Sequence, residues 1–154
     1  MLGSTNLIRE HLRDNAKLIR ETYLKKPFPK GNVAVIEVHL VNDISLSTGA
    51  TSRARSPTPK PKSKLEGGQF EPIIDFYSNL VMDTNAEYKA LSAIADTLDL
   101  LDKNKLRGEL YLYTERKPCE SCVYVLQQFK GKYPNIEIAE IFWDYPYPPV
   151  FEKD

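Results

Sequence analysis

The pattern of apolar and polar positions in the first half of the chain predicts one helix and two strands. Residues 5–23 place apolar side chains three or four positions apart, with basic residues between them, which is typical of an amphipathic helix. Residues 32–40 are rich in β-branched residues and almost continuously apolar, so we expect a mostly buried strand. A second strand is expected over residues 70–77, where Pro72 marks an edge or a bulge.

The second half of the chain alternates between the two patterns more regularly. Residues 82–101 carry the longest helical stripe, and residues 108–114 read as a strand. A further helix is expected over 118–132, followed by a strand over 136–143 whose apolar residues suit a central position. This helix–strand–helix–strand order is typical of a layered sheet with parallel neighbours, so the pattern predicts an α/β fold.

Composition narrows the class of protein without identifying it. The chain has 154 residues, the size of one domain, and 42% of them are hydrophobic, which excludes a wholly disordered or collagen-like chain. We expect no membrane segment, because no stretch approaches the roughly 18 apolar residues of a span, and no signal peptide at the start. The 21 basic and 21 acidic residues cancel, so attraction to nucleic acid would have to come from local clusters.

One such cluster lies between the predicted strands of the first half. Over residues 53–64, prolines alternate with basic residues and no acidic residue interrupts them. We therefore expect a flexible, basic, proline-rich loop over residues 53–68. Such a loop is often only solvated surface, but in a protein that handles a polyanion it can hold phosphates. The basic residues are Arg53, Arg55, Lys60, Lys62 and Lys64.

Two predicted helix starts carry residues that could bind a metal ion or transfer protons. One reads DTNAE and ends at Glu87, and the other reads PCESC and contains Cys119 and Cys122. Thiolates are stabilised at a helix N-terminus, and a C-x-x-C pair can bind one Zn²⁺. A catalytic zinc also needs a third protein ligand, an open position for water and a nearby carboxylate that moves protons.

Each helix start has a simpler interpretation when it is taken alone. Thr84 and Glu87 have the spacing of a capping box, in which both side chains bond to backbone amides at a helix start. Cys119 and Cys122 could be a redox pair, half of a structural zinc site, or two packed thiols.

Taken together, the two helix starts resemble a known family. A-E followed 32 residues later by P-C-x-x-C is similar to the two-part motif of zinc nucleobase deaminases. The flanking segments TNAEYKAL, ELYLYTERKPCESC and VLQQFKGKYPNIEI, with GNVAVIEVHL before them, resemble the deaminase domains of bacterial polymorphic toxins. The resemblance covers residues 31–143 and leaves residues 1–30 unplaced.

The resemblance implies a cytidine deaminase-like three-layer fold, in which helices flank a mixed sheet of four to five strands. We expect residues 1–30 to form an N-terminal helix with a Pro/Lys linker, and residues 31–154 to form the deaminase domain. Cys119 and Cys122 match the family's thiolate ligands for Zn²⁺, and Glu87 matches its general acid and base.

The remaining metal ligand departs from the family pattern. The position two residues before Glu87, where the family has His and sometimes Cys or Asp, is Asn85 here. An amide oxygen is a poorer zinc ligand than an imidazole or a carboxylate. Asn85 is expected as a weak third ligand, and the alternatives are that Asp83 replaces it or that the metal is held loosely.

The resemblance also implies a function. We expect hydrolytic deamination of cytosine in nucleic acid, with DNA favoured, by a secreted toxin that acts in the cytoplasm of a target bacterium and is neutralised by a cognate immunity protein. Arg53, Arg55 and Tyr113 are expected to contact the substrate. The alternatives are an RNA or free-nucleotide deaminase, a catalytically weak binding protein because of Asn85, and a redox C-x-x-C protein.

Overall fold

The computed structural model describes residues 2–28, 31–59, 61–62, 64–71, 86–116 and 120–145, with the backbone alone for 2–5 and 120–122. Three α-helices and four strands make up most of this part of the chain. They are α1 (Leu2–Ile19), β1 (Val33–Leu40), β2 (Ile44–Thr51), α2 (Ala86–Leu98), β3 (Gly108–Arg116), α3 (Glu120–Lys132) and β4 (Ile136–Tyr145). Short helical turns complete it: the π-helical η1 (Arg20–Leu24), η2 (Lys64–Glu66) and η3 (Lys103–Lys105).

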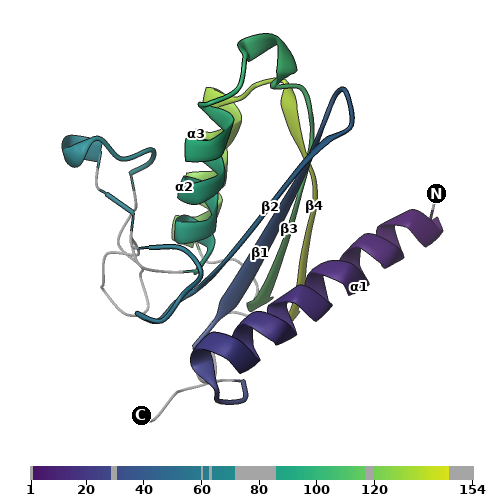
Figure 1. The fold of residues 1–154 in the computed structure, drawn as a ribbon, viewed down its shortest axis with the longest axis vertical. Helices are drawn as coiled ribbons and strands as arrows, with labels where there is room; N and C mark the ends of the chain where they lie inside the picture. The colour runs from purple at the N-terminus through teal and green to yellow at the C-terminus, as the bar shows by residue number, and fades with distance from the viewer. Residues whose placement is uncertain are drawn as a thin grey trace.

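The four strands form one mixed sheet in the order β2-β1-β3-β4. β1 is antiparallel to both of its neighbours, whereas β3 and β4 are parallel. Parallel neighbours need a crossover connection, and α3 provides it. α1 covers one face of the sheet, while α2 and α3 cover the other (Figure 1). The prediction of an α/β fold with a mixed sheet flanked by helices is confirmed.

Alternation along β1 explains why helices cover both faces. Val33 and Val35 pack with Leu12 and Ala16 of α1, whereas Ala34 and the apolar residues that alternate with it pack with α2 and α3. The larger core lies on the α2–α3 face. Its members include Ala34, Ile36, Val38, Leu91, Ile94, Leu98, Leu110, Leu112, Val125 and Phe129.

The second strand does not lie where the sequence pattern places it. The partner of β1 is β2, whereas Phe70 and Glu71 are outside any strand and residues 72–77 lie outside the described residues. Val41, Asn42 and Asp43 join β1 to β2, and the last two have φ values of 65° and 61°. Two successive positive φ angles are typical of a type I′ turn, which suits a tight hairpin.

The position of β4 also differs from the expectation. β4 lies at the edge of the sheet that the described strands form, not at its centre. Its side chains agree with an edge position, since Trp143 and Tyr145 are exposed.

The N-terminal segment packs directly against the sheet. Leu12 and Ala16 are buried in the core on the α1 face, which they share with Tyr113 and Phe142. The domain boundary at residue 30 stays a prediction. In the described part of the chain, none of the helices combines the length and the apolar character needed to span a bilayer.

Candidate active site

Strand ends and helix starts meet at one end of the sheet. α2 and α3 pack against each other, and both begin at the end of the sheet where β3 stops (Figure 1). Glu87 lies in the first turn of α2, and the backbone of Cys122 lies in the first turn of α3. Because helix N-termini carry partial positive charge, this end of the sheet favours anionic groups.

Glu87 is buried, with 3% of its surface exposed, and two side chains hold its carboxylate. Oε1 accepts a hydrogen bond from Nδ2 of Asn32 at 2.6 Å and another from the hydroxyl of Thr114 at 2.5 Å. Asn32 Nδ2 also donates to Thr114 Oγ1 at 2.9 Å, which closes a triangle. One oxygen of the predicted acid and base therefore has a fixed position.

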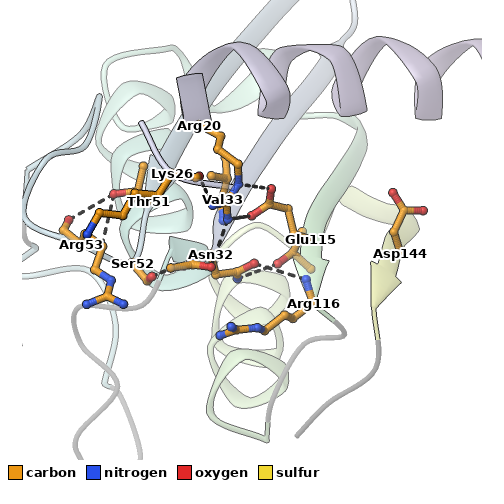
Figure 2. Close-up of polar contacts among 12 residues, drawn as sticks. Arg20, Lys26, Asn32, Val33, Thr51, Ser52, Arg53, Glu115, Arg116 and Asp144 are labelled. Atoms are coloured by element: carbon orange, nitrogen blue, oxygen red, sulfur yellow. Dashed lines mark hydrogen bonds and ion pairs between the residues drawn. The ribbon is translucent and has the colours of Figure 1, made fainter. Parts of the chain in front are cut away.

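Asn32 is itself held from two sides (Figure 2). Its backbone N–H donates to Ser52 Oγ at 2.8 Å, and the backbone N–H of Ser52 donates to its carbonyl at 2.9 Å. The N–H of Arg116 donates to Asn32 Oδ1 at 3.2 Å. The sequence pattern singles out neither Asn32 nor Thr114. The feature of the sequence that could have indicated them is a polar residue at the end of a largely apolar strand.

The loop that follows β2 is fastened to α2 beside Glu87. Lys89 is buried, and its Nζ donates to the carbonyls of Thr51 at 3.0 Å and Arg53 at 2.7 Å. The side chains of Arg53 and Arg116 extend on the side of Asn32 that faces away from α1 (Figure 2). The structure thus brings the start of the basic loop to the same end of the sheet as Glu87.

Arg55 belongs to the same loop. Its side chain is exposed, and its carbonyl accepts a hydrogen bond from Thr51 Oγ1 at 2.5 Å. Lys60 lies outside the described residues.

A buried ion pair lies at the end of β3, on the face of the sheet opposite to Thr114 and Glu87. Glu115 follows Thr114 in β3 and therefore points toward α1. Arg20 Nε donates to Glu115 Oε2 at 2.7 Å and Nη2 to Oε1 at 2.5 Å, and both side chains are buried. Glu115 Oε1 also accepts the N–H of Val33 at 2.9 Å, which ties β1 to the pair. The end of β3 is therefore held from both faces (Figure 2).

Tyr113 is not brought to Glu87. Its ring is buried in the core on the α1 face, and its hydroxyl donates to Asp144 Oδ2 at 2.6 Å. Burial, together with the hydrogen bond to Asp144, raises the pKa of Tyr113 well above its usual range. In this arrangement the ring cannot contact a substrate beside Glu87, because the sheet lies between them.

The expected zinc ligands fall mostly outside the described residues. Asp83, Asn85 and Cys119 lie outside them, and only the backbone of Cys122 is described. Among described side chains, no group of three His, Cys, Asp or Glu residues could hold a metal ion. The chemistry of the expected donors fits zinc, because two thiolates and one oxygen leave a fourth position open.

A comparison with known protein families matches the part of the chain that contains the expected site residues. The model of the Toxin-deaminase family, described as the BURPS668_1122 family of deaminases, matches residues 69–142. No match was found among curated proteins. The matched range contains Glu87 and both cysteines. The resemblance to toxin deaminases is therefore confirmed for this range.

Proposed function

We propose that this chain, whose residues 69–142 match the model of the Toxin-deaminase family, deaminates cytosine in nucleic acid with the help of zinc. The observation that carries the proposal is the buried Glu87 carboxylate, which Asn32 and Thr114 hold at the start of α2. A helix cap needs no donors from two neighbouring strands. A carboxylate that moves a proton does need such an orientation.

In this proposal Cys119, Cys122 and either Asn85 or Asp83 hold the zinc. When bound, zinc polarises water and lowers its pKa toward neutrality. Glu87 takes a proton from the attacking water and delivers it to the exocyclic amino group, which leaves as ammonia. The backbone of Cys122 lies in the first turn of α3, and a helix N-terminus favours a thiolate there.

Basic groups around the same end of the sheet support a polyanionic substrate. Arg53 and Arg55 lie on the loop that Lys89 fastens to α2. A second basic region follows at the end of α1, where a pocket of about 500 Å³ opens. It is lined by Lys17, Arg20, Glu21, Lys25, Lys26 and Pro27. Phosphate contacts from such groups position a nucleic acid without reading its sequence.

The family suggests the biological setting. A toxin of this kind is secreted and acts in the cytoplasm of a target bacterium, and the producing cell needs a cognate immunity protein. DNA is the favoured substrate, and RNA and free nucleotides are the competing ones. Because Asn85 replaces a stronger ligand, a weakly active binding protein is the second candidate function.

Metal analysis combined with deamination assays tests the proposal. We expect the purified chain to carry one zinc, and Cys122→Ser to lose it. Cytosine should be converted in oligonucleotides, with single-stranded and duplex DNA, RNA and free cytidine compared in parallel.

Glu87→Gln tests the role of the carboxylate. The amide still accepts hydrogen bonds but cannot move a proton, so the variant should fold normally and lose about 10²–10⁴ of the rate. A fully active Glu87→Gln would disprove the catalytic role. Zinc binding without conversion of any substrate would favour the binding protein instead.

A further inference from the structure

We infer that Asn32 and Thr114 are positioning residues, which hold Oε1 of Glu87 and so fix the orientation of its carboxylate. This inference rests on the proposed function, because it assigns a role to the groups that surround the proposed acid and base. Both residues lie at strand ends, Asn32 just before β1 and Thr114 near the end of β3.

The direction of each hydrogen bond follows from the groups involved. An amide nitrogen only donates, and Asn32 Oδ1 accepts the N–H of Arg116, which fixes which end of the amide faces Glu87. Asn32 Nδ2 therefore donates to both Glu87 Oε1 and Thr114 Oγ1. The single hydroxyl proton of Thr114 is then directed at Glu87 Oε1.

Two donors therefore converge on one carboxylate oxygen. Oε1 of Glu87 has two lone pairs, and Asn32 and Thr114 each take one. The same two bonds fix the rotation of the carboxylate, so Oε2 keeps one direction throughout the reaction.

The surroundings make this orientation rigid. Asn32, Glu87 and Thr114 are all buried and come from three separate parts of the chain: the residue before β1, the start of α2 and the end of β3. Asn32 is anchored by Ser52 and by the N–H of Arg116, so its amide has little freedom to follow a moving carboxylate. Groups that support a reacting side chain commonly change the rate about 10- to 100-fold when they are removed.

A purely structural network would have different consequences. If Asn32 and Thr114 only joined the strand ends, removing the hydroxyl would lower stability, and folded protein would keep its turnover. If they orient Glu87, turnover falls in protein that is fully folded. The hydroxyl alone should restore it.

The activity test therefore compares Thr114→Val with Thr114→Ser. Thr114→Val keeps the shape and removes the hydroxyl, so kcat on a cytosine oligonucleotide should fall about 10- to 100-fold, with KM unchanged. Thr114→Ser restores the hydroxyl and should restore kcat. Thr97→Val is the matched control, because the Thr97 hydroxyl is exposed and donates to the carbonyl of Ala93 in the same helix.

A second readout does not depend on activity. The unfolding equilibrium constants of the wild type, Thr114→Val, Glu87→Leu and the double variant form a double-mutant cycle. A hydrogen bond to a charged group should make the two substitutions non-additive by about tenfold or more. If Thr114→Val does not fold, Thr114→Ala removes the same hydroxyl and leaves room for neighbouring side chains to relax.

The outcomes separate this inference from the proposed function. Loss of kcat in Thr114→Val, rescue by Thr114→Ser and a non-additive cycle support the inference. Unchanged kcat in Thr114→Val, with Glu87→Gln inactive, overturns the inference and leaves the proposed function intact. Full activity of Glu87→Gln overturns the proposed function itself. Additive stability effects show that the hydrogen bond to Glu87 is not formed, which also overturns the inference.

Discussion

Removal of the Arg20 charge is expected to destabilise the fold more than any surface substitution. Among the described residues, Arg20 donates two hydrogen bonds to the carboxylate of Glu115, and others to the carbonyls of Lys26 and Gly31. Arg20→Met keeps much of the apolar length of the side chain but leaves Glu115 buried without its cation. The N-terminal segment also loses its attachment to the end of β3.

The magnitude follows from the burial of the pair. The side chains of Arg20 and Glu115 are each 10% exposed, so solvent screens the pair weakly. Breaking a buried ion pair by removing one partner typically costs about 3–5 kcal/mol. The whole domain is expected to be stable by only about 5–15 kcal/mol, so this single change removes a large share of its stability.

Urea denaturation followed by circular dichroism measures this cost directly. Arg9→Met is the control, because Arg9 pairs with Asp144 while 39% exposed, and such a pair is worth about 0–1 kcal/mol. Replacing both partners, as in Arg20→Met with Glu115→Leu, should recover part of the loss, since no charge is left buried. A loss below about 1 kcal/mol for Arg20→Met would refute the reasoning.

Two further predictions concern the expected substrate contacts. Neutralising the basic loop should lower the slope of log affinity for nucleic acid against log salt by up to about 3.5–4.5. Neutralising Lys103 and Lys105 of η3, which precedes the start of β3, should leave the slope unchanged. An unchanged slope after neutralising the loop would identify the loop as solvated surface. Tyr113→Phe should cost about 1 kcal/mol of stability and leave deamination unchanged, because the lost hydroxyl faces Asp144; a large loss of turnover in the folded variant would contradict this placement. Partial burial raises the pKa of Asp144, but hydrogen bonds from Tyr113 and Arg9 and the charge of Arg13 outweigh this effect and hold the pKa below its usual range. These contacts therefore stabilise the fold above about pH 4. The cost of Tyr113→Phe should shrink as the pH falls below that value. The five neutralised loop residues are Arg53, Arg55, Lys60, Lys62 and Lys64.

Elements with a strong apolar pattern were predictable from the sequence. β1 has core residues on both faces, and its range of Val33–Leu40 differs from the expected one by a single residue. β2 was missed because it has few apolar residues and contains Gly49, although residues 44–47 alternate between apolar and polar as a half-buried strand does. A Cβ at Gly49 would lie 2.4 Å from Cδ1 of Ile19, so the glycine lets β2 approach the end of α1. The sequence pattern of β2 does not reveal this contact.

The candidate site likewise contains residues that the sequence predicts and residues that it does not. Glu87 was predictable, because the residue type and its spacing to the C-x-x-C motif are visible in the sequence. Asn32 and Thr114 depend on the antiparallel register that pairs Ala34 with Thr114, and the chain order does not determine this register. The same alternation turns Tyr113 toward α1. Thr114 reaches the site and its neighbour Tyr113 does not, because adjacent residues of a strand point to opposite faces of the sheet. The sequence pattern alone does not determine which face each residue takes.

The end of β3 links the N-terminal segment to the proposed chemistry. Thr114 contacts Glu87 on one face, and the next residue, Glu115, contacts Arg20 on the other. β1 is joined to both layers, because Asn32 contacts Glu87 while the N–H of Val33 contacts Glu115. A displacement of either strand end would therefore break hydrogen bonds on both faces at once. α1 and η1, which the family match does not include, accordingly hold in place the strand ends from which Glu87 receives its donors.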